Sequence, residues 1–249
     1  MIILAIFMLI EFCLPVHNEE RILKSNVLKL LDYCNSQNFN FDWQIIIINN
    51  GLTDNSEKIS QGLADKYKNI KIKNIKQSGK GCALKLYWQN SKADIVIYMD
   101  IDLAVSLNNI SDLIQPIIKK NYDLVIGSRL LPNSKINRSF IRELSSQSYN
   151  FLSRMVLGHH FSDLQCGFKA IKVDVFKKIA PYIQNEKWFF DTELIIFSNY
   201  FGYKIKEIPV DWQENRYDTR KSKINILRDG IKFLGNLIVL RIRIWYNNH

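Results

Sequence analysis

Short runs of apolar residues alternate with amphipathic stretches along the first half of the chain. Four runs have the length of a strand: about Ile10–Val16, Gln44–Ile48, Asp94–Met99 and Leu124–Ile126; Ile70–Ile75, which carries polar residues between its isoleucines, predicts a further short strand. Continuous apolar runs of this kind are typical of strands buried on both faces of a parallel sheet. The stretch after the first run predicts a helix, since one helical face carries Leu23, Val27, Leu30, Leu31 and Cys34. This alternation predicts an α/β fold with a mostly parallel sheet flanked by helices.

Further helices are expected over Ser56–Tyr67, 79–89, Asn109–Lys119 and Arg138–Leu157, and a further strand near Lys204–Val210. The last segment, 224–246, mixes apolar residues with several arginines and lysines. It predicts an amphipathic basic helix, which either lies in a membrane interface or packs on the domain with a solvated basic face. Proline and glycine are scarce and no linker is evident, so we expect one domain over residues 1–249.

The first ten residues, Met1–Ile10, are wholly apolar. A membrane-spanning helix needs ~20 such residues, and the segment lacks the basic start and the cleavage site of a signal peptide. It is therefore expected to be an added strand, a shallow membrane insertion or a truncated anchor. With the basic last segment, it favours a peripheral or shallowly anchored protein on the cytoplasmic face of a membrane.

The chain is basic, with 34 Lys and Arg against 24 Asp and Glu and a formal net charge of +10. Such a surplus attracts nucleic acids, anionic lipids or phosphorylated ligands. Runs of five like charges and nucleic-acid-binding motifs are absent from the sequence, so nucleic acid is not an expected partner. The four cysteines are scattered, which argues against a zinc site and a disulfide framework.

Two carboxylates, Asp100 and Asp102, directly follow the apolar run 95–99. Ligands of open α/β sheets gather where parallel strands end. Two acids one residue apart at such a point can hold a hard divalent cation against a diphosphate. The alternative is an ordinary turn, because aspartate is common after strands.

Nine segments, taken in order, resemble glycosyltransferase family 2 and its polyprenyl-phosphate branch, which includes dolichyl-phosphate glucose and mannose synthases. They are Pro15–Glu20, Asn49–Asp54, Gly79–Ala83, Asp100–Asp102, Gly127–Arg129, Asp163–Lys169, Phe190–Glu193, Pro209–Trp212 and Ser222–Lys223. The resemblance spans about residues 10–240. It implies a GT-A fold and an inverting enzyme that uses Mg²⁺ or Mn²⁺. Such an enzyme moves a hexose from a nucleotide sugar to a polyprenyl or dolichyl phosphate.

The resemblance also implies roles for individual residues. Asp100 and Asp102 hold the metal, and the nucleotide pocket consists of Pro15, His17, Glu19, Asn49, Asn50, Asp54, Lys80 and Asp100. The acceptor phosphate and the sugar are expected to contact Arg129, Arg142, Ser146, Gln165, Asp191, Glu193 and Lys223. Asp163 and Arg129 are the expected catalytic residues. An amide oxygen of the Asn49-Asn50 pair can accept the single N3–H of uracil, which favours a uridine nucleotide.

Other observations leave choices open. Ala104 stands where the mannose synthases have a glutamine, as in the glucose synthases, which favours glucose. If the acceptor is a hydroxyl of a saccharide or cell-wall precursor, Asp163 is needed as a base. If the acceptor is a phosphate monoester, whose second pKa is ~6, Asp163 only orients or balances charge. A catalytically silent sugar-nucleotide binder is the third possibility, and the oligomeric state stays unknown.

Overall fold

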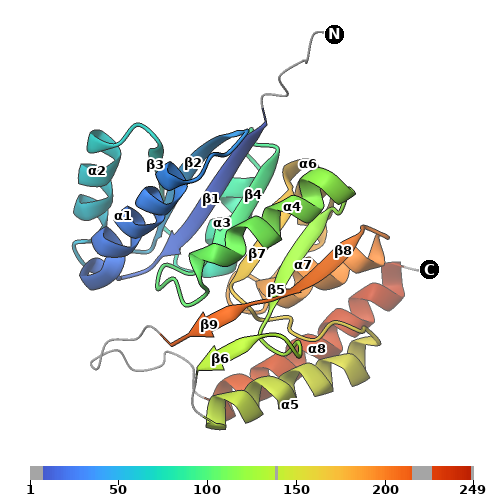
Figure 1. Ribbon diagram of the computed structural model, residues 1–249. Helices are drawn as coiled ribbons and strands as arrows, with labels where there is room; N and C mark the ends of the chain where they lie inside the picture. Colours follow the sequence, from blue (N-terminus) through green and yellow to red (C-terminus); the bar gives the residue numbers. More distant parts are fainter. Residues whose placement is uncertain (1–7, 138–139, 215–225, 248–249) are drawn as a thin grey trace, which may run out of the picture.

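The central element is a seven-stranded sheet. The computed structural model describes residues 8–137, 140–214 and 226–247 (Figure 1). The strands are β1 (Leu9–Val16), β2 (Asp42–Asn50), β3 (Ile70–Ile75), β4 (Ile95–Met99), β5 (Leu124–Ser128), β7 (Phe168–Lys172) and β8 (Ile205–Pro209). Their order in the sheet is β3-β2-β1-β4-β7-β5-β8. A separate ribbon pairs β6 (Lys135–Asn137) with β9 (Asp211–Gln213). The predicted α/β class and mostly parallel sheet are confirmed.

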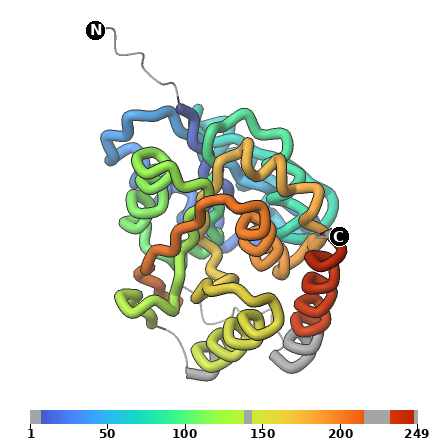
Figure 2. Tube along the Cα trace, turned by 90° about the vertical axis from the view of Figure 1, so that its right-hand side faces the viewer, coloured from blue at the N-terminus to red at the C-terminus, as the bar shows by residue number. Residues whose placement is uncertain are grey.

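Helices cover both faces of this sheet (Figure 1). One face packs against α1 (Glu20–Ser36), α2 (Ser56–Lys66) and α4 (Ile110–Lys120). The other packs against α3 (Lys80–Trp88), α6 (Val173–Ile179) and α7 (Phe190–Tyr200). Two longer helices, α5 (Phe140–Leu157) and α8 (Ile226–Asn247), lie side by side in both views (Figure 2). Short 3-10 turns lie at Leu107–Asn109 and Ala180–Tyr182.

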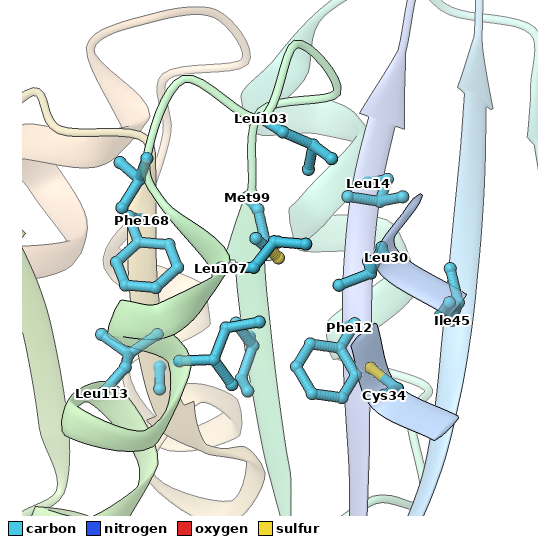
Figure 3. Packing of buried hydrophobic residues seen from close by; sticks show 14 of the residues in the cluster. Phe12, Leu14, Leu30, Cys34, Ile45, Met99, Leu103, Leu107, Leu113 and Phe168 are labelled. Atoms are coloured by element: carbon cyan, nitrogen blue, oxygen red, sulfur yellow. The ribbon is translucent and has the colours of Figure 1, made fainter. Parts of the chain in front are cut away.

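Burial on both faces explains why the inner strands β1, β2, β4 and β5 read as mostly apolar runs. In β4, Ile97 and Met99 belong to the core cluster on the α1 side, while Val96 and Tyr98 belong to the cluster on the α3 side. Successive side chains of a strand point to opposite faces, so both faces need apolar residues. Figure 3 shows the α1-side cluster, which includes Met99 of β4 and Phe12 and Leu14 of β1. The predicted apolar face of α1 is buried as expected.

One strand runs against the others. β7 pairs antiparallel with both β4 and β5, and Met99 lies opposite Phe168. The start of β7 therefore lies at the same sheet edge as the end of β4. The sequence pattern indicated a motif over 163–169 and no strand over 168–172. Four buried residues and a half-buried Lys172, with two lysines among the five, match neither the alternating nor the continuous pattern, so the strand was missed.

The structure describes part of each end segment for which membrane contact is expected. Leu9 and Ile10 begin β1, and Ile10 is buried. Residues 1–7 lie outside the described residues, so the choice among strand, insertion and anchor stays a prediction. The expected helix over 224–246 is α8. Among the helices of the described ranges, none has the length and apolar character needed to cross a bilayer.

Candidate active site

The predicted site residues follow strands that meet at one edge of the sheet. From β1 the chain adds β2 and β3 on one side, and β4 then pairs with the other side of β1. Open α/β sheets bind ligands in the crevice at such a switch in strand order. His17 follows β1, Asn50 ends β2 and Asp100 follows β4. Arg129 follows β5, two strands further along the sheet.

Asn50 joins three elements at this edge. Its side-chain nitrogen donates to the Val16 carbonyl at 2.7 Å, and its side-chain oxygen accepts from the Gly79 N–H at 3.1 Å. Nδ1 of His17 lies 2.8 Å from the main-chain oxygen of Asn50. These contacts fix the ends of β1 and β2 against the start of α3, which carries Lys80.

Asn49 lies on the opposite face of β2, because adjacent residues of a strand point to opposite sides. Its nitrogen donates to Oδ1 of Asn74 at 2.8 Å, and its oxygen accepts from the Ser60 hydroxyl at 3.0 Å. The structure therefore brings Asn50, and not Asn49, to the site. Pro15 lies inside β1 opposite Ile48.

Asp54 and Glu19 tie the start of α1 to the start of α2. Asp54 accepts from the N–H groups of Ser56 at 2.9 Å and Glu20 at 3.1 Å, and the N–H of Glu19 donates to the Ser56 hydroxyl at 3.0 Å. Burial alone would raise the pKa of Asp54, but these hydrogen bonds lower it. Asp54 is therefore an ionised carboxylate that orders the loop after β2.

A chain of polar contacts leads from Asp100 into the protein. The Tyr98 hydroxyl donates to Oδ1 of Asp100 at 2.6 Å and accepts from Nζ of Lys80 at 2.6 Å. Lys80 also pairs with Oδ2 of Asp191, and Lys169 donates to Oδ1 of Asp191 at 2.7 Å. The side chains of Asp191 and Lys169 are fully buried. Two ammonium groups thus share one buried carboxylate beside the predicted metal-binding acid.

The charge states in this chain follow from its contacts. Burial would raise the pKa of Asp191, but Lys169 and then Lys80 outweigh it and lower the pKa. Burial, and after it the charge of Asp100, raises the pKa of Tyr98 well above its usual value. Asp191 is accordingly ionised near neutral pH, and the Tyr98 hydroxyl keeps its proton as a donor.

Asp100 and Asp102 have the chemistry of a hard-cation site. The Asp100 N–H donates to the Gly167 carbonyl at 3.2 Å, and a Cβ on Gly167 would lie 2.0 Å from Oδ2 of Asp100. Oδ1 of Asp102 accepts from the Ala104 N–H at 3.3 Å. The ranges that the structure describes hold no cluster of three or more candidate metal ligands. Two carboxylates fit Mg²⁺ or Mn²⁺, because such ions bind through one or two carboxylates together with substrate phosphates.

Arg129 and Asp163 form a bidentate ion pair. Nε and Nη2 of Arg129 donate to the two carboxylate oxygens at 2.7 and 3.0 Å, and the N–H groups of Arg129 and Gln165 donate to the same carboxylate. Burial would raise the pKa of Asp163, but Arg129 and these hydrogen bonds lower it to about 2. Asp163 is fully buried and remains an anion near neutral pH.

A cavity of about 840 Å³ opens beside this ion pair. Arg129 and Arg154 contribute positive charge to its walls, Glu143 contributes one carboxylate, and Leu131, Ile136 and Phe151 contribute apolar surface. Phe151 and Arg154 come from α5, so this helix forms one wall. The cavity therefore offers both cationic and apolar contacts to one ligand.

Of the other predicted acceptor residues, Gln165 and Ser146 have described contacts, whereas the Arg142 side chain and Lys223 are not described. Nε2 of Gln165 donates to Oγ1 of Thr192 at 2.7 Å, and Tyr149 of α5 contacts the same hydroxyl at 2.6 Å. Ser146 lies in α5, where its carbonyl accepts from Asn150 at 2.9 Å. Arg142 also lies in α5, with its side chain outside the described part. Lys223 lies outside the described residues.

Glu193 points away from Asp191. Both residues lie in α7, and two residues along a helix turn the side chain by about 200°. Glu193 accepts from the N–H groups of Gln184 and Asn185 at 2.8 and 2.7 Å and pairs with Arg243 of α8. Residues two apart share a face only in an extended segment, and this segment is helical, so the two carboxylates do not lie together.

Sequence analysis did not identify Tyr98 or Lys169 as site residues. The spacing of Tyr98 and Asp100 carries a signal, since residues two apart on a strand share a face. Lys169 gives a weaker one, because a lysine inside an otherwise apolar strand is almost never fully buried without a partner.

Comparison with known proteins identifies the family of the chain. Residues 11–180 match the family described as Glycosyl transferase family 2. Glycosyltransferase AglD of Haloferax volcanii is 29% identical over 95% of this chain, which spans 37% of AglD. Dolichyl-phosphate beta-glucosyltransferase ALG5A of Trichomonas vaginalis is 30% identical over 94% of this chain and 73% of its own length. The human dolichyl-phosphate beta-glucosyltransferase is 26% identical over 92% of this chain and 74% of its own.

The fold also matches crystal structures. Glucosyl-3-phosphoglycerate synthase from Mycobacterium tuberculosis, in complex with uridine-diphosphate, has a TM-score of 0.67 at 17% identity, over 95% of this chain and 80% of that one. These structures share the GT-A fold with this chain. Because the family match runs from β1 through β7 and includes Asp100 and Asp163, the chain belongs to glycosyl transferase family 2.

Proposed function

We propose that the protein is an inverting glucosyltransferase that moves glucose from a uridine-diphosphate sugar to a polyprenyl phosphate with the help of Mg²⁺ or Mn²⁺. The main support is the arrangement of charged groups at one edge of the sheet. Asp100 lies at the end of β4 near Lys80 at the start of α3, and the Arg129–Asp163 pair lies beside a cavity with cationic and apolar walls. The names of the relatives from Trichomonas and human support the acceptor and the sugar. The mycobacterial complex with Mn²⁺ and uridine-diphosphate-glucose supports the donor and the ion.

On the donor side, Asp100 and Asp102 hold the cation and Lys80 contacts the diphosphate. When bound, the cation neutralises the charge that develops on the leaving nucleotide. The Lys80 ammonium has three donors: Tyr98 and Asp191 accept from two of them, and the third can be donated to a phosphate oxygen. Asn50 keeps the start of α3, and so Lys80, at the sheet edge.

On the acceptor side, Arg129 binds the phosphate. The Asp163 carboxylate accepts from two of the five N–H donors of the Arg129 guanidinium and so holds its plane in one orientation. A phosphate oxygen attacks the anomeric carbon, the new carbon–oxygen bond forms, and the bond to the diphosphate breaks with its electron pair leaving on the nucleotide. Positioning and charge stabilisation supply the rate acceleration.

The pKa of Asp163 favours a phosphate acceptor over a hydroxyl. A hydroxyl nucleophile needs a base whose pKa lies near the working pH, and Asp163 has a pKa of about 2. A phosphate monoester is already a dianion above its second pKa of ~6 and needs no base. Asp163 therefore serves as the partner that orients Arg129.

The α5–α8 surface is the proposed membrane contact. We define it as the exposed apolar residues of these two helices: Leu144, Phe151, Met155, Leu234, Ile238, Val239, Ile242, Trp245 and Tyr246. Arg154, Lys232 and Arg241 are exposed among them. Apolar surface with interspersed positive charge is typical of helices that lie in the interface of an anionic membrane. Phe151 belongs to both this surface and the cavity wall, which suits an acceptor drawn from the cytoplasmic leaflet.

The transfer is tested with purified protein, Mn²⁺ and labelled donors. Label from UDP-glucose is expected in the organic extract when a polyprenyl phosphate is supplied, and not with the unphosphorylated polyprenol or a soluble saccharide. GDP-mannose serves as the matched donor control. Label confined to a water-soluble product contradicts the lipid acceptor, and transfer from GDP-mannose alone contradicts the donor.

Membrane contact is tested by sedimentation with vesicles. Binding is expected to anionic vesicles and to weaken with salt, because the attraction is partly electrostatic. Ile238→Asp is expected to reduce binding, whereas Leu86→Asp, at an exposed apolar residue of α3, is the matched control. Equal loss in both variants, or equal binding by both, contradicts the α5–α8 surface as the contact.

A further inference from the structure

Tyr98 is the one polar side chain of β4, whose other residues are Ile95, Val96, Ile97 and Met99. Its ring is fully buried in the core cluster on the α3 side. Its hydroxyl points along the same face as Asp100, because residues two apart on a strand share a face. The 2.6 Å contact with Oδ1 of Asp100 follows from that geometry.

We propose that Tyr98 is a positioning residue of the donor site, whose hydroxyl holds the Asp100 carboxylate and the Lys80 ammonium in one hydrogen-bonded line. The proposal rests on the proposed function for the role of Asp100 in cation binding. It assigns Tyr98 no contact with the substrate. Tyr98 acts by fixing the distance between the acid that meets the cation and the lysine that meets the diphosphate.

Each end of this line has a second restraint. Oδ2 of Asp100 faces Gly167 so closely that a Cβ there would lie 2.0 Å away. The carboxylate is therefore limited by Gly167 on one oxygen and by the Tyr98 hydroxyl on the other. At the far end, Lys80 keeps its contact with Asp191.

The ring of Tyr98 also contacts the two lysine ammonium groups. Nζ of Lys80 lies 4.8 Å and Nζ of Lys169 5.9 Å from the ring centroid, within the range of cation–π attraction. A phenylalanine at this position keeps the ring and its packing and removes only the hydroxyl. Tyr98→Phe therefore separates the hydrogen-bonded line from the role of the side chain in the core.

The experiment measures Mn²⁺ binding without acceptor or turnover. Free Mn²⁺ is followed by electron paramagnetic resonance during titration of the full-length protein in the presence of UDP. Tyr98→Phe is expected to weaken Mn²⁺ binding roughly tenfold or more, as for other groups that orient a metal ligand. UDP affinity in EDTA and the thermal midpoint are expected to stay near the wild-type values. Tyr87→Phe, at a half-buried tyrosine beside Glu11, is the matched control.

A double-mutant cycle completes the test. In an Asp100→Asn background, Tyr98→Phe is expected to cause little further loss, because the two residues act as a unit. Equal Mn²⁺ affinity in wild type and Tyr98→Phe overturns the proposal and leaves the proposed function intact. A loss of UDP affinity in EDTA that matches the loss of Mn²⁺ affinity also overturns it. If the wild type itself binds no Mn²⁺ with UDP, the metal-dependent function fails, and this role fails with it.

Discussion

Replacing Asp163 by asparagine keeps the shape of the side chain and removes the charge that Arg129 faces. The carboxylate of Asp163 accepts four hydrogen bonds, from Nε, Nη2 and the main-chain N–H of Arg129 and from the N–H of Gln165. In Asp163→Asn one carboxylate oxygen becomes an NH₂ group, so some of these N–H groups face another donor in place of an acceptor. Arg129, whose side chain is largely buried, then keeps its charge without an anionic partner.

The size of the effect follows from burial. The side chain of Asp163 is fully buried and that of Arg129 is 14% exposed. Removing one partner of a buried ion pair costs roughly 3–5 kcal/mol. The pKa gives a separate figure for the charge alone: the fall from 3.8 to about 2, at ~1.4 kcal/mol for each pKa unit, corresponds to roughly 2–3 kcal/mol. A loss of about 3 kcal/mol in the free energy of unfolding at pH 7 satisfies both.

The pH dependence has a definite sign. Because folding lowers the pKa of Asp163 to about 2, its contribution to stability is present above its unfolded pKa of about 4. That contribution is lost as the pH falls from about 4 to about 2. Wild type and Asp163→Asn are therefore expected to differ most at neutral pH and to approach each other in acid.

Urea denaturation followed by circular dichroism at several pH values measures these differences. Asp65→Asn, at an exposed residue of α2, is the matched control and is expected to change stability by less than about 0.5 kcal/mol. In an Arg129→Gln background, Asp163→Asn is expected to cost less, because the charge it compensates is gone. A stability of Asp163→Asn equal to that of wild type at pH 7 refutes the reasoning.

Two further variants test other parts of the structure. Gly167→Ala is expected to weaken Mn²⁺-dependent UDP binding roughly tenfold or more in equilibrium dialysis, since its Cβ would lie 2.0 Å from a carboxylate oxygen of Asp100. Gly62→Ala, whose Cβ meets nothing within 4 Å, is the control, and equal affinity in the two variants contradicts the expectation. Arg243→Met is expected to lower the free energy of unfolding in urea by about 3 kcal/mol, because it leaves the buried Glu193 carboxylate of α7 without its cation. Exposed Arg241→Met is its control, and equal stability of the two variants is the contrary result.

The first half of the fold follows from the sequence because each element there has the period of its type. The continuous apolar runs gave β2 and β4, and the apolar face of α1 gave that helix. α7 was missed because nine of its eleven residues are buried. A helix buried all round has no polar face and therefore no helical period to detect.

The positions of some site residues also follow from the sequence. Strand ends bring Asp100 and Arg129 to one edge whatever the details of packing, so their positions follow from topology. The partners of Lys80 and Asp163 depend on contacts across many residues: Lys80 meets Asp191 and Asp163 meets Arg129. Sequence patterns hold no information on which side chain fills the space beside a given charge, so these pairs emerge only from the folded structure.

In the proposed function, a divalent cation at the end of β4 joins the protein to the donor diphosphate. A crystal structure with Mn²⁺ and UDP-glucose, with anomalous scattering used to locate manganese, tests it most directly. An anomalous peak is expected within bonding distance of carboxylate oxygens of Asp100 or Asp102 and in contact with the diphosphate. A manganese ion bound elsewhere, or a diphosphate held at this edge by side chains alone, contradicts it.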